Sequence, residues 1–139
     1  MTEEYHSPSL TIKIIGHQWY WAYEYSDMKN ISFDSFLIES SKIRLLETRN
    51  HMIIPVNTTI RLLISSEDVI HSWTIPSLGV KVDAIPGRIN QLIIHANRVG
   101  IIVGQCREIC GANHRFIPIT VSAITPQKFI ESISLNGRD

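Results

Sequence analysis

Residues 11–25 read TIKIIGHQWYWAYEY, a run in which the side chains alternate in character. Successive side chains of a β-strand point to opposite faces, so a period of two indicates extended structure with one buried face. The pattern places Trp19, Trp21, Tyr23 and Tyr25 on one face and Tyr20 on the other. This stretch therefore favours a β-rich fold with aromatic side chains in its interior.

The rest of the chain continues the β pattern. Further short strands are expected at Ile43–Glu47, Met52–Val56, Thr59–Ser65, Arg88–His95, Gly100–Val103 and Ile117–Ile124. Gly, Pro and Asn residues separate them, as is typical of turns. Many short strands in one chain predict an all-β sandwich or barrel.

The C-terminal residues depart from this pattern. Thr125 followed by Pro126 is a typical helix start, because a capping side chain precedes a proline at the first helical position. Phe129, Ile130 and Ile133 would dock this helix onto the β-structure. We therefore expect one short helix after the last strand.

Length and composition limit the possible classes of protein. The chain has 139 residues, 44% of them hydrophobic, which is enough for a single buried core. Its 13 basic and 13 acidic side chains give no formal net charge, so nucleic acid is not an expected partner. No apolar run approaches the ~18–20 residues that span a bilayer, and no signal peptide is recognisable at the N-terminus.

The two cysteines of the sequence lie in a short cluster with a histidine. Cys106, Cys110 and His114 follow one another at steps of four residues, and His71 is a further candidate ligand upstream. Gly111 is a poor helix residue, which favours a loop wrapped around an ion over a helix with all three donors on one face. Thiolates and imidazoles suit copper or zinc. The spacing also leaves open a short disulfide loop or a buried pair of thiols.

Four motifs of the sequence closely resemble one protein family. They are GHQWYW (residues 16–21), SSEDVIHSW (65–73), AIPGR (84–88) and GQCREICGANHRFIP (104–118). In this order they resemble the water-exposed domain of subunit II of cytochrome c oxidase, which carries the dinuclear copper centre CuA. The resemblance runs from about residue 8 to the C-terminus. It implies a cupredoxin-like Greek-key fold, in agreement with the predicted sandwich or barrel.

The resemblance assigns metal-binding roles to five residues. It implies that Cys106 and Cys110 bridge two copper ions through their thiolates. His71 and His114 would each bind one of these ions, and the backbone carbonyl of Glu108 would be a weak ligand. The side chain of Glu108 would help bind a magnesium ion shared with subunit I, since oxygen ligands suit that hard cation. Thiolates favour Cu(I) and imidazole accepts both oxidation states, so this donor set suits a one-electron centre.

Position 117 departs from the family pattern. The family places a methionine three residues after the second histidine ligand, and this chain has Ile117, which carries no donor atom. Three explanations are open. The site is a variant with a shifted potential, because the axial donor tunes a copper centre; or the site has decayed; or a mitochondrial methionine codon has been translated as isoleucine.

The same resemblance assigns roles in the reaction with cytochrome c. Trp19 would be the aromatic ring through which an electron enters, although a strand tryptophan more often serves core or interface packing. Glu24, Asp27, Glu67 and Asp68 would contribute to an acidic patch that steers the basic cytochrome c. Such steering falls with ionic strength. The alternative is that these carboxylates form an ordinary solvated face.

Together these features predict an electron-transfer subunit of cytochrome c oxidase that passes electrons from cytochrome c to haem a in subunit I. The expected organisation is an exit linker (residues 1–10), a cupredoxin-like CuA domain (11–125) and a C-terminal helix and tail (126–139). Family members begin with two membrane helices, so the chain is a fragment, or half of a split subunit whose helices a separate chain supplies.

The expected location is the mitochondrial inner membrane, with the domain facing the intermembrane space and contacting subunit I and other oxidase subunits. Two alternative functions stay open. One is a structural oxidase subunit with a degenerate site, and the other is a single-metal copper or zinc protein on the same scaffold.

Overall fold

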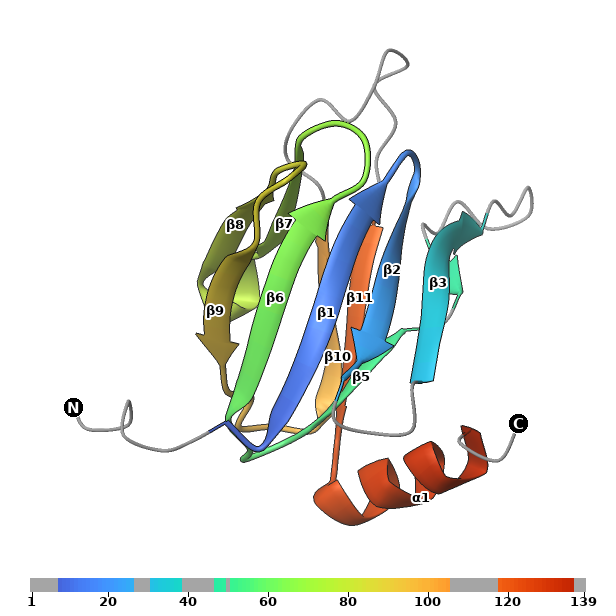
Figure 1. Cartoon of the computed structure of the whole chain (residues 1–139). Helices are drawn as coiled ribbons and strands as arrows, with labels where there is room; N and C mark the ends of the chain where they lie inside the picture. Colours follow the sequence, from blue (N-terminus) through green and yellow to red (C-terminus); the bar gives the residue numbers. More distant parts are fainter. Residues whose placement is uncertain (1–7, 27–30, 39–46, 50, 106–117, 137–139) are drawn as a thin grey trace, which may run out of the picture.

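Two β-sheets packed face to face make up most of the chain (Figure 1). The computed structural model describes residues 8–26, 31–38, 47–49, 51–105 and 118–136. The first sheet contains β1 (Leu10–His17), β2 (Tyr20–Tyr25), β3 (Ile31–Ile38), β4 (Glu47–Arg49), β6 (Ile60–Ser66) and β9 (Asn90–Ile94). The second contains β5 (Met52–Pro55), β7 (His71–Ile75), β8 (Val80–Ala84), β10 (Gly100–Gln105) and β11 (Pro118–Ile124). A 3₁₀ turn, η2 (Pro76–Leu78), joins β7 to β8, and the helix α1 (Pro126–Asn136) follows β11.

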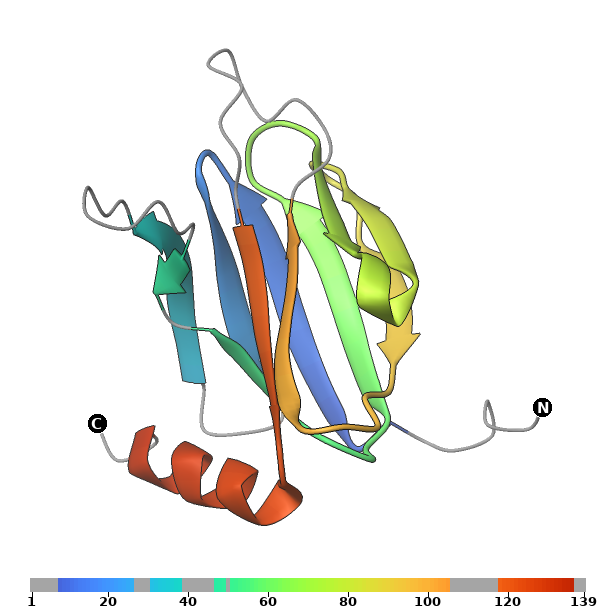
Figure 2. The same cartoon turned by 180° about the vertical axis from the view of Figure 1, so that it is seen from behind.

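The strand order mixes segments that are distant in the sequence. The first sheet runs β4-β3-β2-β1-β6-β9 and the second runs β5-β11-β10-β7-β8. β1 pairs in parallel with β6, and β5 pairs in parallel with β11, whereas the other neighbours are antiparallel. A view from behind shows the second sheet in front, with α1 across one end of the sandwich (Figure 2). The predicted all-β sandwich with a short C-terminal helix is confirmed.

The core lies between the sheets and is built from alternate residues of the central strands. The parallel register of β1 and β6 joins buried aliphatic residues in pairs: Leu10↔Ile60, Ile12↔Leu62 and Ile14↔Ile64. Burial of one such side chain contributes about 1.5–3 kcal/mol, so this double row is a major source of stability.

The stretch from residue 11 to residue 25 forms a hairpin, and the prediction of one continuous alternating run was wrong. β1 and β2 are antiparallel, with Gln18 and Trp19 in the turn between them. The inward residues are even-numbered in β1, such as Ile14, and odd-numbered in β2, such as Trp21. The turn therefore shifts the phase of the alternation by one residue.

Several expected strands are present. The predictions that began at Met52, Thr59, Arg88, Gly100 and Ile117 correspond to β5, β6, β9, β10 and β11, with ends displaced by a few residues. Of the predicted strand Ile43–Glu47, residues 43–46 lie outside the described part of the chain, and Glu47 begins β4. The sequence analysis missed β3, β7 and β8.

The C-terminal helix starts where it was predicted. Thr125 caps it, because its Oγ1 accepts a hydrogen bond from the Lys128 N–H at 3.2 Å. Phe129 is buried, and Ile133 packs against the core one turn later. The predicted docking role of Ile130 was wrong: it is 63% exposed, because a rotation of about 100° per residue turns it away from the Phe129 face. Within the described residues, no helix has the length and apolar character needed to cross a membrane.

Two buried tyrosines of β2 connect the sheets through their hydroxyl groups. The Tyr25 hydroxyl donates to the Ile53 carbonyl at 2.6 Å and accepts from the Ile53 N–H at 2.8 Å. The Tyr23 hydroxyl accepts a hydrogen bond from Trp73 Nε1 at 3.4 Å. Burial raises the pKa of both tyrosines well above its ordinary value.

This pKa shift predicts that the fold loses stability in alkali. A raised pKa in the folded state contributes stability that is fully present below the unfolded pKa of about 10 and is lost as the pH rises above it. We therefore expect the free energy of unfolding, measured with denaturant between pH 8 and pH 11, to fall above pH 10. The Tyr25→Phe variant should show a shallower fall, since one of the two linked protons is gone. An identical pH dependence in both proteins would contradict the assignment.

Candidate metal centre

One end of the sandwich gathers the segments that carry the sequence motifs. The β1–β2 turn and the loop of residues 67–70 between β6 and β7 both lie at this end (Figure 1). Gln105, the last residue of β10, is paired with both Thr74 and Pro118. The residues that flank the cysteine-containing segment, Gln105 and Pro118, therefore lie on the neighbouring strands β10 and β11, and β10 is also the neighbour of β7, the strand that begins with His71.

The structure describes part of the predicted site. Of the predicted residues it contains Trp19, Glu24, Glu67, Asp68 and His71. Those outside the described residues are Asp27, Cys106, Glu108, Cys110 and His114, together with the variant position Ile117.

His71 is buried, and one of its ring nitrogens is held by a carboxylate. Its side chain is fully buried, and Nε2 lies 2.9 Å from Asp68 Oδ1. A carboxylate only accepts hydrogen bonds, so it selects the tautomer with the proton on Nε2. The lone pair then sits on Nδ1, which is buried without a hydrogen-bond partner among the described residues. Such an unpartnered polar atom costs about 1–3 kcal/mol unless a ligand uses it, and imidazole nitrogen suits both copper and zinc.

Asp68 holds both the histidine and the neighbouring hairpin. Its Oδ2 accepts a hydrogen bond from the Gln18 N–H at 2.8 Å, and its Oδ1 accepts one from the Val69 N–H at 2.6 Å. Partial burial opposes the charged form of Asp68. Hydrogen bonds from His71, Gln18 and Val69 outweigh this effect, so the pKa of Asp68 is lowered. The carboxylate is therefore an anionic link between the β1–β2 turn and the candidate ligand.

The space around the His71 ring is closely filled. The Trp21 ring meets it edge-on, with 5.7 Å between ring centroids. On the other strand of the hairpin is Gly16, where an added Cβ would lie 2.7 Å from His71 Cδ2 and 3.0 Å from Trp21 Cζ3. Only glycine fits here without displacing one of the rings. The sequence analysis missed this role, because the contact joins segments more than 50 residues apart.

Trp19 lies beside this network. It is partly buried, packs against the core and occupies the turn residue next to Gln18. Since the Gln18 N–H is bound to Asp68, the position of the turn is tied to that of His71. The structure thus brings Trp19, Asp68 and His71 together at one end of the molecule.

The predicted acidic residues are distributed unevenly. Glu67 and Asp68 are exposed in the loop that also presents the apolar side chains of Val69 and Ile70. Glu24 lies farther along β2, directly opposite Lys13 of β1.

A carboxylate that the sequence analysis missed is exposed on β3. Desolvation and the charges of Asp34, Asp68 and Glu67 raise the pKa of Tyr20, so Asp34 and the loop carboxylates act on the same tyrosine. Only the tertiary structure shows this shared effect, because Glu67 and Asp68 come from a loop that is distant from β3 in the sequence.

Sequence and structure comparisons identify similar proteins. A sequence model of the family described as "Cytochrome C oxidase subunit II, periplasmic domain" matches residues 10–124. The chain is 52% identical to "Cytochrome c oxidase subunit 2" of Ctenocephalides felis, over 99% of this chain and 63% of that protein. It is 54% identical to the Choristoneura rosaceana protein of the same description, over 96% of this chain and 61% of that protein. The chain thus spans less than two thirds of the length of these relatives.

A solved structure has the same fold. The periplasmic domain of subunit II of cytochrome oxidase from Bradyrhizobium japonicum is similar, with a TM-score of 0.87 and 40% sequence identity. The similarity covers 94% of this chain and 95% of that one, so the whole sandwich has a counterpart in that domain.

Proposed function

The chain belongs to the cytochrome c oxidase subunit II family, and from that membership we propose that it is the electron-accepting domain of this oxidase. It receives electrons from cytochrome c at a dinuclear copper centre and passes them to haem a in subunit I. The matched relatives include insect proteins, and the proposed location is the mitochondrial inner membrane, facing the intermembrane space.

The state of His71 is the observation that carries this proposal. A histidine with no metal to bind would be expected to satisfy both ring nitrogens or to expose one of them to water. Here Nε2 is bound to a carboxylate, whereas the buried Nδ1 has no hydrogen-bond partner among the described residues. At metal sites, the ring N–H of a ligating histidine that faces away from the metal usually donates to a carboxylate, a carbonyl or a water.

The residues that would hold the copper ions are His71, Cys106, Cys110 and His114, with the backbone carbonyl of Glu108 as a weak ligand. When bound, the copper pair supplies a centre that gains and loses one electron with little change in geometry. The side chain of Glu108 would contribute to a magnesium site shared with subunit I, because carboxylate oxygen suits that cation.

A short chain of contacts supports Trp19 as the point at which electrons enter. Trp19 is bonded to Gln18, whose N–H donates to Asp68, and Asp68 accepts from the Nε2–H of His71. The ring and the ligand are therefore joined by covalent bonds and two hydrogen bonds. His114 would provide the route onward to haem a.

The exposed loop of residues 67–70 supports a docking surface for cytochrome c. Its carboxylates, Glu67 and Asp68, are suited to steering a basic protein, and Val69 and Ile70 offer apolar contact beside them. Glu24 and Asp27 would extend the acidic surface along β2 and beyond its end. Lys13 opposite Glu24 weakens the negative potential at that position.

Copper loading tests the proposal. The chain, with its thiols reduced, is loaded with copper, and the copper content is measured together with the electron paramagnetic resonance spectrum. We expect two copper ions per chain and hyperfine structure shared by both nuclei. His71→Ala should abolish the shared spectrum, whereas His95→Ala, at an exposed position, should retain it.

The same measurement separates the alternative functions. Ile117 in place of the family's methionine favours a degenerate or single-metal site as the second candidate. One copper ion, zinc alone or no retained metal would contradict the proposed role. Restoration of the two-copper spectrum by Ile117→Met would then assign the loss to that position.

A further inference from the structure

A groove runs beside β10, where the second sheet is incompletely paired. β10 pairs with β11 at six register positions but with β7 only at Gln105↔Thr74. Gly104 still lies tightly against β7, since a Cβ added there would be 1.9 Å from the Thr74 carbonyl oxygen. Pairing between β10 and β7 stops beyond this point. Thr74 is followed by Ile75 and then by Pro76, which has no N–H and begins η2. The resulting groove has a volume of about 880 Å³.

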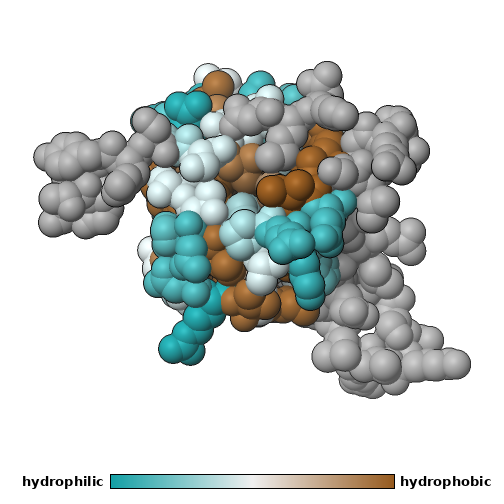
Figure 3. Space-filling view, turned by 90° about the horizontal axis from the view of Figure 1, so that it is seen from below, coloured by the Kyte–Doolittle hydropathy of each residue, from teal (hydrophilic) through white to brown (hydrophobic). Residues whose placement is uncertain are grey.

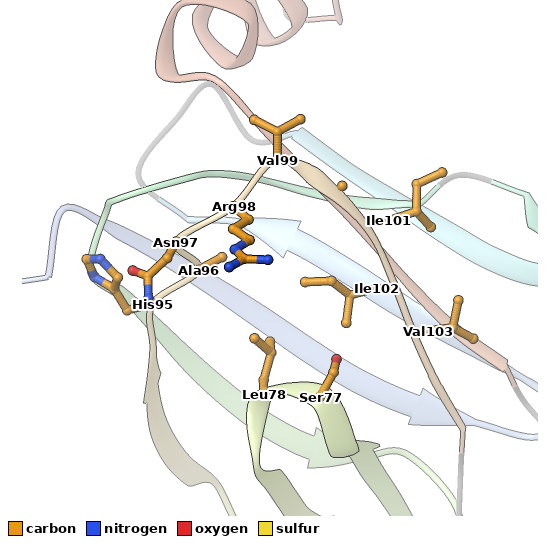
Figure 4. Close-up of a pocket in the computed structure, with 11 residues that line it drawn as sticks. Ser77, Leu78, His95, Ala96, Asn97, Arg98, Val99, Ile101, Ile102 and Val103 are labelled. Atoms are coloured by element: carbon orange, nitrogen blue, oxygen red, sulfur yellow. The ribbon is translucent and has the colours of Figure 1, made fainter.

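The groove has a mixed lining, with apolar side chains from η2 and β10 and polar ones from Ser77, Asn97 and Arg98. Leu78, Ile102 and the guanidinium group of Arg98 face a common space in the groove (Figure 4). Ile101 and Val103 are exposed along its β10 side, at 67% and 60%. None of the lining residues is acidic, and no described residue forms an ion pair or hydrogen bond with the Arg98 side chain. Among the described residues, the positive charge of Arg98 therefore has no acidic partner in the groove.

The backbone of β10 has hydrogen-bonding groups on the side that faces away from β11. In an antiparallel pair, alternate residues direct their N–H and C=O groups to one neighbour, and the remaining residues direct theirs to the other side. Within the described chain, no backbone hydrogen bond joins residues 100–103 to η2. Figure 2 shows β10 flanked by β11 on one side and by η2 on the other. This side of β10 is thus an open strand edge, of the kind that accepts an added strand.

We propose that this groove binds an extended segment of a neighbouring oxidase subunit, which adds as a strand to β10. An apolar side chain of the segment fits against Leu78 and Ile102, and a carboxylate one or two residues away pairs with Arg98. An extended peptide fits better than a helix, because a helix has already used its own backbone groups and leaves the β10 edge unpaired. An arginine that faces a carboxylate also gains directional, charge-assisted hydrogen bonds.

The proposed contact rests on the place of the chain in the oxidase, but it uses a different surface from electron transfer. From Gly104 the groove extends along β10 to residues 95–99, towards the end that carries α1. That end shows hydrophobic side chains reaching the surface among polar ones (Figure 3). An anchored segment therefore leaves the loop of residues 67–70 accessible to cytochrome c.

Matched isoleucines allow a controlled test in the assembled oxidase. Ile101 in the groove and Ile130 on α1 are 67% and 63% exposed, so they differ in location rather than in burial. We expect Ile101→Glu and Arg98→Glu each to lower the amount of this chain in the purified oxidase by about tenfold, since both oppose the partner's carboxylate. Ile130→Glu should leave that amount unchanged. Equal effects of the two isoleucine variants, or no effect of either, would overturn the proposal.

Copper content and electron paramagnetic resonance spectra of the same variants, measured on the separate chain, keep this test independent of the electron-transfer proposal. They should match the unsubstituted chain, whatever its copper state. The partner is identified by placing the photo-crosslinker p-benzoylphenylalanine at position 103 in the assembled oxidase. A cross-link to an extended segment of another subunit, with Asp or Glu near the linked residue, supports the proposal. A cross-link to phospholipid, to a second copy of this chain or to a helix would overturn it, as would the absence of any cross-link.

Discussion

Replacing Asp68 with asparagine is expected to weaken copper binding by about 10- to 100-fold, the usual effect of removing a hydrogen-bond partner behind a ligating histidine. The carboxylate accepts hydrogen bonds on both oxygens, from His71 and Val69 on one and from Gln18 on the other. An amide can accept on only one side, so its NH₂ group must face an N–H donor. The variant therefore loses either the tautomer of His71 or the tie to the β1–β2 turn.

Glu67→Gln is the matched control, because it removes a neighbouring exposed carboxylate that has no hydrogen bond to His71. Copper affinity is measured by competition with a chelator of known affinity, for both variants and the unsubstituted chain. Glu67→Gln should bind copper as tightly as the unsubstituted chain. If Asp68→Asn also binds normally, the carboxylate does not set the tautomer of His71. If both variants bind weakly, the loss reflects the charge of the loop rather than the hydrogen bond.

A strand with one solvated face has an alternating pattern that can be recognised in the sequence. β6 alternates between buried and partly buried residues along its whole length, so a period-two pattern is visible in its sequence. In β7 all five residues are buried, so its sequence carries no alternation, and this strand was missed. The hairpin turn was missed for another reason. Gln18 and Trp19 include none of the usual turn residues, and only the change of phase between β1 and β2 marks the turn.

The candidate site also contains parts that could be predicted from the sequence and parts that could not. The motif that contains His71 and Asp68 is local, so both residues could be selected from the sequence. The hydrogen bond from Gln18 to Asp68 joins residues 50 positions apart. It exists because β1 and β6 are parallel neighbours, with Gly16 in register with Ser66, and this register brings the two connecting loops together. Sequence reasoning could not predict that pairing, and so could not predict that Asp68 acts on both loops.

Replacing Trp21 with alanine is expected to lower the free energy of unfolding by about 3–5 kcal/mol, the range for deleting a large aromatic side chain from a core. Trp21 is fully buried and contacts the His71 ring, so the cavity would open beside the candidate ligand. A domain of ordinary stability has only about 5–15 kcal/mol in total, so the variant would be close to unfolding. Denaturant unfolding of the metal-free chain measures this loss.

Comparing two Trp→Phe variants isolates the contribution of the indole N–H. Trp21 Nε1 has no hydrogen-bond partner among the described residues, whereas Trp73 Nε1 donates to the Tyr23 hydroxyl. Both substitutions remove similar volume from buried positions. Trp73→Phe also leaves the buried Tyr23 hydroxyl without its partner, which adds about 1–3 kcal/mol to its cost.

We therefore expect Trp73→Phe to be more destabilising than Trp21→Phe. Equal losses, or a larger loss for Trp21→Phe, would mean that the N–H of Trp21 has a bonding partner in solution, such as a buried water. In that case a buried water between the two rings could also bind His71 Nδ1, and this atom would not need a metal ion as its partner. A larger loss for Trp73→Phe would leave the buried Nδ1 lone pair as the feature that a metal ion satisfies.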